Sequence, residues 1–247
     1  MKNAETHQDR VEYATELVTD FDLETDAEFF TEPQNRLDFI SSLDADEFAD
    51  LARHINARMR GYEPREKTTI HEKGGFLPLE ATPKAKEKPE SLEAGFNAIK
   101  EYLDNSADSV EEKTRGVGMA VEALIIWVHP YNDGNGRTSR FLAKFIEDGT
   151  TDIDELITET ASNDSRQRIY NGTLRVDQWN LVKDADLIMD DDELESYRVT
   201  EMPVAEGIAK SLKRLLENKA YQDKVDVQTE RYLKQRAAYE AKHTLAA

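Results

Sequence analysis

The sequence has no cysteine, so neither a disulfide framework nor a thiolate zinc site can form in it. It also lacks a long apolar run: the longest, from Ala123 to Val128, is much too short to span a bilayer. The first residues do not show the charged-then-apolar pattern of a secretory signal. We therefore expect a cytoplasmic protein with no membrane partner, and secretion by a non-classical route stays open as an alternative.

Positive charge is scarce. Lysine and arginine number 32 against 51 aspartate and glutamate residues, which gives a formal net charge of -19. Such an excess of negative charge argues against nucleic acid as the main partner, because the phosphate backbone would be repelled. Basic or neutral protein partners fit better, and an acidic surface can also serve only to keep the protein in solution.

Alternating β-type patterns are few and helical spacing of apolar residues dominates, so we predict a mostly α fold. A chain of 247 residues is long enough for one large domain with appendages. We divide it into an N-terminal helical region at 1–60, a core at 61–185 and a C-terminal helical extension at 186–247. The predicted helices cover residues 44–61, 91–104, 108–128, about ten residues through Phe145 before Gly149, and 204–243.

One segment, residues 67–79, differs from this helical pattern. Two threonines and Ile70 precede the pair Gly74-Gly75, and an apolar return follows. This order predicts a small β-hairpin. The next segment, 80–91, has two prolines and no large apolar residue before its end, so we predict a surface loop there.

The most informative segment is residues 129–140, which read HPYNDGNGRTSR. An apolar helix runs up to Val128, and Pro130 must stop it. A residue before proline is biased out of the helical region, so His129 is fixed at a helix exit. An imidazole mounted in this way can act as a base near neutral pH.

The glycine turn that follows suits a phosphate. Gly134-Asn135-Gly136 allows positive φ and close backbone approach just before a new helix. Such a turn aims backbone N–H groups and the positive end of the helix dipole at one point. The sequence therefore predicts an anion site at the start of this helix.

Charged side chains beside the turn extend this interpretation. Arg137 and Arg140 are three apart on the helix, so both guanidinium groups can reach the same polyphosphate. Asp133 comes directly before the turn, where a carboxylate can hold a Mg²⁺ ion that bridges phosphates. We therefore predict that the segment binds a nucleoside triphosphate with its metal ion.

The segment resembles the signature of the Fic (Fic/DOC) family, HPFx[DE]GNGRxxR, and departs from it only at Tyr131, where phenylalanine is usual. The resemblance implies a helical bundle with the motif between two helices. It also implies a protein adenylyltransferase, which moves AMP from Mg·ATP to a hydroxyl side chain of a target protein or of itself. The implied roles are a general base at His129, a Mg²⁺ ligand at Asp133, and phosphate contacts at Gly134, Asn135, Gly136, Arg137 and Arg140. The ring of Tyr131 is expected to anchor the loop in the core.

The resemblance extends to segments outside the motif. Members of the family carry a hairpin flap before the core, which would align the target segment by strand addition. They often have a tyrosine near the nucleotide base, and Tyr170 stands where that residue is expected. The residues assigned to the flap are Ile70, His71, Gly74, Gly75 and Phe76.

Many members of the family are held inactive by a glutamate in an [ST]xxxE[GN] helix. The nearest sequences here are Glu217-Asn218 and Glu206-Gly207, and neither has the expected Ser or Thr. Our hypothesis is that Glu217 restrains Arg140, which would make a self-inhibited enzyme that can also remove AMP. The alternatives are a separate inhibitory protein or no inhibitor at all, and a homo-oligomer stays open as a further partner.

Two other functions stay open. The same site could transfer UMP, phosphate or phosphocholine in place of AMP. A protein of a different class, a non-enzymatic acidic interaction protein, would use the net charge of -19 and would bind no nucleotide.

Overall fold

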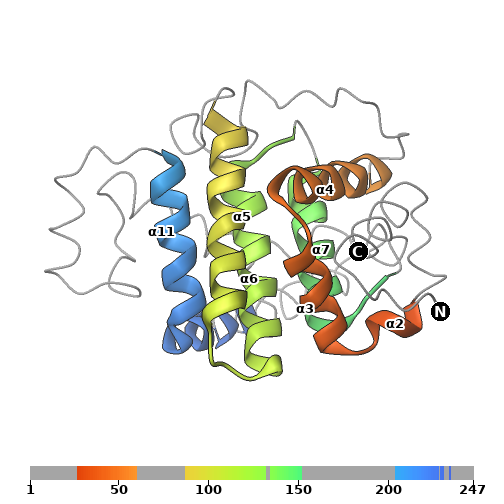
Figure 1. Cartoon of the computed structure of the whole chain (residues 1–247), viewed down its shortest axis with the longest axis vertical. Coiled ribbons are helices and arrows are strands. Elements are labelled where there is room, and N and C mark those ends of the chain that lie inside the picture. The colour runs from red at the N-terminus through yellow and green to blue at the C-terminus, as the bar shows by residue number, and fades with distance from the viewer. Residues whose placement is uncertain are drawn as a thin grey trace, which may run out of the picture.

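The structure is a computed structural model that describes residues 27–59, 87–131, 134–151, 204–227, 229–230 and 234. The elements assigned in these ranges are helices, as the sequence predicts, and no strand occurs among the described residues (Figure 1). The predicted hairpin at 67–79 lies outside them. The helices are α2 (Ala27–Phe30), α3 (Pro33–Ser42), α4 (Ala45–Met59), α5 (Lys88–Asn105), α6 (Val110–Val128), α7 (Asn135–Asp148) and α11 (Val204–Glu217).

Helix α6 forms the centre of the fold. A capping box starts it: Ser109 Oγ accepts from the N–H of Glu112 at 3.3 Å, and the Glu112 carboxylate accepts from the N–H of Ser109 at 2.9 Å. From Gly116 to Val128 every residue is buried. A helix that is apolar all round can lie only inside a protein, and α5, α7, α11 and α3 surround it.

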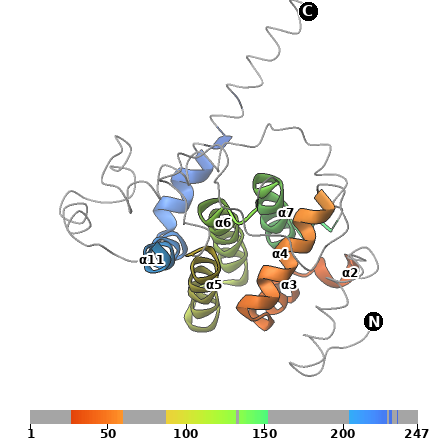
Figure 2. The ribbon, with the colours of Figure 1, turned by 90° about the horizontal axis from the view of Figure 1, so that it is seen from above.

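The helices around α6 run in directions that bring four helix ends together. Gly95 of α5 lies against Leu124, and Gly118 lies against Glu147 of α7, so α5 and α7 are both antiparallel to α6. Gly95 also lies against Leu212 and Ile208, and Gly116, about two turns earlier on α6 than Leu124, lies against Leu216, so α11 is antiparallel to α6 and parallel to α5. The N-termini of α5, α7 and α11 therefore share one end of the bundle with the C-terminus of α6. We call this end, at the top of Figure 1, the motif end, and Figure 2 views the bundle from it.

The described helices share one hydrophobic core, which extends from Phe30 to Val225. Phe48 of α4 stacks on Phe96 of α5 with ring centroids 4.3 Å apart, so the N-terminal helices belong to the same core as the motif. The predicted boundaries at 60/61 and 185/186 fall outside the described residues, and the division into regions stays a prediction. No described helix combines the length and apolarity that a transmembrane span requires.

Several predicted helix boundaries are confirmed. Asp44 caps α4, because its carboxylate accepts from the N–H of Glu47 at 2.9 Å. Gly149 ends α7 with φ of 75°. The predicted surface loop at 80–91 is wrong in its last residues, since α5 already begins at Lys88. Pro89 is compatible with this start because a helix tolerates proline in its first turn.

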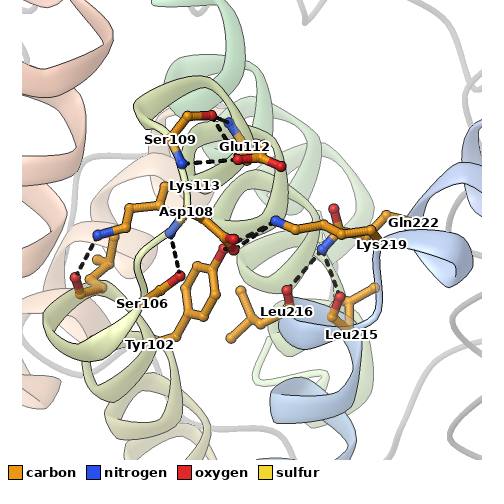
Figure 3. Close-up of polar contacts among 11 residues, drawn as sticks. Tyr102, Ser106, Asp108, Ser109, Glu112, Lys113, Leu215, Leu216, Lys219 and Gln222 are labelled. Carbon is orange, nitrogen blue, oxygen red and sulfur yellow. Dashed lines mark hydrogen bonds and ion pairs between the residues drawn. The ribbon is translucent and has the colours of Figure 1, made fainter.

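The opposite end of the bundle, which we call the far end, is held by a polar network (Figure 3). The Tyr102 hydroxyl donates to Asp108 Oδ2 at 2.5 Å, and Lys219 Nζ donates to the same oxygen at 2.7 Å. The hydrogen bonds from Lys219 and Tyr102 lower the pKa of Asp108 to about 2. The network joins α5, the α5–α6 connection and the helical segment after α11.

Arg36 of α3 is a second polar tie, and its guanidinium is buried. It donates to four backbone carbonyls: those of Phe30 at 2.5 Å, Thr31 at 2.9 Å, Ile146 at 2.8 Å and Glu147 at 3.1 Å. Two of these carbonyls belong to the last turn of α7, and carbonyls in the last turn of a helix have no N–H partner within the helix. Arg36 therefore fixes the C-terminus of α7 to α2 and α3.

Replacement of Asp108 by Asn tests the far-end network. The lowered pKa of Asp108 means that its ionised form stabilises the fold above the ordinary value of 3.8, and this contribution is lost as the pH falls toward about 2. The variant should therefore be less stable than the wild type at pH 7, with a difference that shrinks below pH 4. Urea unfolding from pH 7 to pH 3 measures it. A difference that does not change with pH would contradict the assignment, and Asp104→Asn, at an exposed position of α5, is the control.

Arg36→Met should lower the free energy of unfolding by about 2–4 kcal/mol, because four buried or half-buried carbonyls lose a charged donor. The measurement is urea unfolding followed by circular dichroism. Lys234→Met, which removes an exposed ion pair with Glu230, should change stability by less than about 0.5 kcal/mol. Equal effects of the two substitutions would show that Arg36 does not hold α7 in place.

Candidate active site

The site begins where the buried helix α6 ends. His129 is its C-cap, with φ of 49° and ψ of 57°, and its N–H donates to the carbonyl of Ile125 at 3.0 Å. No other non-glycine residue among those described has a positive φ. The left-handed conformation costs an L-residue about 1–2 kcal/mol. The sequence correctly predicted that Pro130 takes His129 out of the helix, but it favoured an extended conformation, not the left-handed one.

The imidazole of His129 is mounted on rigid structure. Its residue is 8% exposed, so it lies at the edge of the core and not on a free surface. Before it, Trp127 and Val128 are fully buried. A base held between a packed helix and a proline loses little orientational freedom when a substrate binds, which is what general base catalysis requires.

Lys88 contacts this helix end, and sequence reasoning missed it. Its Nζ donates to the carbonyl oxygen of His129 at 2.7 Å, and the residue is only 1% exposed. We had placed Lys88 in a solvated loop because its neighbours in the sequence are lysines and prolines. No local pattern distinguishes it from these neighbours, since its burial depends on the packing of α5 against α6.

Gly134 carries the turn into α7. Its φ of 82° lies in the left-handed region that glycine adopts without strain, and it is the N-cap of α7. Thr138 makes the first helical hydrogen bond, to the carbonyl of Gly134 at 2.8 Å. Gly134 has no side chain, and the first turn of α7 has no side-chain cap hydrogen bond, so the positive end of the helix dipole lies at this turn. The turn and the helix start agree with the sequence, and the binding of a phosphate there stays a prediction.

The side chain of Asn135 closes the loop, while its predicted phosphate contact stays a prediction. Its Nδ2 donates to the carbonyl of Tyr131 at 2.6 Å, and its Oδ1 accepts from the N–H of Tyr131 at 3.0 Å. Both ends of the side-chain amide are thus used to close the loop, and the residue is only 2% exposed. The side chain of Asn135 therefore shapes the turn, and only its backbone N–H is suited to a phosphate.

Tyr131 anchors the same loop in the core, as predicted from its aromatic ring. The residue belongs to the hydrophobic core and is 4% exposed. Burial raises the pKa of its hydroxyl, and the ion pair of Arg53 with Asp50, at 2.7 Å, lies close enough to add smaller opposing effects. The hydroxyl that distinguishes Tyr131 from the usual phenylalanine thus faces α4.

The structure brings together part of the predicted site. His129, the glycine turn and the first two turns of α7 lie at the motif end, and Gly136, Arg137 and Arg140 are partly exposed there. The metal ligand Asp133, the base contact Tyr170 and the flap lie outside the described residues, so their roles stay predictions. No group of His, Asp or Glu within the described ranges could hold a metal ion by itself. The flap residues concerned are Ile70, His71, Gly74, Gly75 and Phe76.

The hypothesis that Glu217 restrains Arg140 is wrong. Glu217 ends α11 and lines a surface hollow with Asn105, Asp108 and Lys219, which places it at the far end. Leu216 packs at the level of Gly116 on α6, about 20 Å along the helix axis from His129. Helices α11 and α7 also lie on opposite sides of α6 (Figures 1 and 2). Sequence spacing could not show which end of the bundle the C-terminal end of α11 would reach.

Comparison with known proteins supports the motif. Residues 42–146 match a family model described as the Fic/DOC family. The matched range contains α4, α5, α6, the motif and α7 up to Ile146, whereas α11 lies beyond it. No curated protein and no solved structure matches the chain.

Asn135→Ala should open the turn. The substitution leaves the buried N–H and carbonyl of Tyr131 without partners, which should lower the free energy of unfolding by about 2–3 kcal/mol. It should also weaken nucleotide binding, because the first turn of α7 is no longer held. Urea unfolding and calorimetry with Mg·ATP measure the two effects. Asn105→Ala removes an exposed amide that bonds to the Glu101 carbonyl and is the matched control; if both variants behaved alike, Asn135 would not close the loop.

Proposed function

The chain carries a Fic/DOC family domain, and we propose that it is a protein adenylyltransferase that moves AMP from Mg·ATP to a hydroxyl side chain of a target protein. Members of the family typically transfer nucleotides or other groups. The observation that supports the proposal is the position of His129: this buried residue, with a left-handed backbone, ends α6, and α7 begins a few residues later without a side-chain cap. A base and an anion site thus lie within one short loop.

The helix ends at this site favour a polyphosphate. The N-terminus of α7 begins at the turn and carries about half a positive charge, and α5 and α11 begin at the same end of the bundle. Arg137 and Arg140 add two cations on the first turns of α7, where they oppose the dipole of their own helix. A bound triphosphate removes this conflict. Local positive charge is needed in this protein, because its overall charge of -19 repels ATP.

In the proposed reaction the phosphates lie on the first turn of α7, with Arg137 and Arg140 on their oxygens. Asp133 would hold Mg²⁺, which when bound neutralises negative charge on the phosphates. His129 takes the proton of the target hydroxyl while the hydroxyl oxygen attacks the α-phosphorus in line. The bond between the α-phosphorus and the oxygen that leads to the β-phosphate breaks, so that pyrophosphate leaves and AMP stays on the target.

The remaining predicted parts complete this proposal. The flap at 67–79 would lay the target segment beside the site, and Tyr170 would contact the nucleotide base. The acceptor is a Tyr, Ser or Thr of a partner protein or of the enzyme itself. The described residues do not indicate whether the target protein is basic or acidic.

The identity of the transferred group has alternatives, which are UMP, phosphate and phosphocholine. UMP transfer would use the same turn and the same base, since neither Gly134 nor His129 selects the nucleobase. Transfer of phosphate or phosphocholine would cleave a different bond. Mass spectrometry of the purified protein after incubation with Mg²⁺ and each nucleotide separates these outcomes, because AMP, UMP and phosphate add different masses.

The alternative function from a different class is that of a non-enzymatic acidic interaction protein. It would bind a basic partner through its charge and would have no use for the turn at Gly134. Calorimetry with Mg·ATP distinguishes the two, since such a protein would give no heat of nucleotide binding.

His129→Ala should reduce AMP transfer by about 10²- to 10⁴-fold, the usual effect of a positioned general base. Nucleotide affinity should stay within a few-fold of the wild type, because the imidazole is not needed to hold the phosphates. Transfer from α-labelled ATP and calorimetry measure the two quantities. His54→Ala, which removes a histidine on α4 bonded to the Asp50 carbonyl, is the matched control. Undiminished transfer by His129→Ala would remove His129 from the mechanism.

A further inference from the structure

Lys88 is placed against the usual preferences of a lysine. Its side chain is buried, and its hydrogen-bond partner among the described residues is an uncharged carbonyl, not a carboxylate. Burial of an ammonium group without a carboxylate is unfavourable. It is also the first residue of α5, where a cation opposes the helix dipole. A residue held in such a position needs a compensating interaction.

The compensating interaction is with the end of α6. The ammonium group donates to the carbonyl of His129 at 2.7 Å, at the negative end of the α6 dipole. Because Pro130 has no N–H, this carbonyl is the one hydrogen-bonding group of the peptide plane between His129 and Pro130. Lys88 therefore holds the orientation of that plane.

The ψ angle of His129 determines the orientation of this peptide plane. With φ of 49° and ψ of 57°, His129 lies in a region that L-residues rarely adopt, and it must be held there by its surroundings. The backbone conformation sets the direction of the Cα–Cβ bond of His129 and limits the rotamers that its imidazole can adopt. A contact on the carbonyl thus acts on the base without touching the substrate.

We propose that Lys88 is a positioning residue, which locks the backbone of His129 in the left-handed conformation and so aims the imidazole at the reacting hydroxyl. The inference rests on the proposed function for its catalytic consequence, but its structural part does not. Burial lowers the pKa of Lys88, which agrees with an ammonium group kept inside the protein for one specific contact.

Lys100 provides a matched control on the same helix. Its Nζ donates to the carbonyl of Leu43, the residue that caps the C-terminus of α3, at 2.5 Å. The two lysines thus make the same kind of bond, to the last carbonyl of a helix, but only Lys88 reaches His129. Lys88→Met and Lys100→Met each remove one such bond, so a general loss of packing or stability appears in both.

The first measurement is AMP transfer at a temperature where both variants are folded. Lys88→Met should lower kcat by 10-fold or more while the Kd for Mg·ATP stays within about 2-fold, and Lys88→Arg should recover part of kcat. Lys100→Met should keep the wild-type kcat. If kcat of Lys88→Met also stayed at the wild-type value, Lys88 would be only structural and the proposal would be overturned. Should Lys88→Met not fold, Lys88→Leu, which also removes the donor, takes its place with the same criteria.

The second measurement does not depend on activity. The chain has five histidines, and His129→Ala assigns the imidazole signal of His129 in nuclear magnetic resonance spectra of histidine-labelled protein. In Lys88→Met this signal should shift or broaden, whereas in Lys100→Met it should not. An unchanged signal in Lys88→Met would overturn the positioning role. A wild type that transfers no AMP but shows the predicted shift would contradict the proposed function and leave the positioning role standing.

Discussion

The way in which the buried helix α6 ends determines the rest of the site. A helix enclosed on every side must leave the core at a defined point, and α6 does so at His129. The left-handed conformation there stops the helix, and Pro130 prevents its continuation. The chain then reverses within a few residues, because the side-chain amide of Asn135 binds both backbone groups of Tyr131. His129 and the first turn of α7 are therefore close for a purely conformational reason.

The two ends of the bundle differ in their polar contacts. Three helices begin at the motif end and one ends there, so partial charges of both signs lie at that end, with two arginines on the first turns of α7. The far end carries ion pairs between helices, such as those of Arg115 with Asp223 and Asp226. Charged side chains thus tie the far end together, whereas anion binding is the proposed role of the motif end.

The sequence predicted those features that depend on a few neighbouring residues. The helices at α4, α6 and α7, the helix exit at His129 and the glycine turn all follow from local rules, since capping, proline and glycine act within one or two turns. Features that depend on packing were missed. Lys88 looked like one of several surface lysines, the loop-closing bonds of the Asn135 side chain were not predicted, and Glu217 matched a spacing but lies at the wrong end of the bundle. Burial and the direction of a helix are tertiary properties, and no short pattern encodes them.

The most direct measurement is a crystal structure of the protein with Mg²⁺ and an ATP analogue that cannot be cleaved at the α-phosphorus. The account predicts the phosphates on the N–H groups of the first turn of α7, with the α-phosphorus facing the imidazole of His129 and the carbonyl of His129 still bound by Lys88. A nucleotide bound elsewhere, or an imidazole turned into the core with the nucleotide in place, would contradict it.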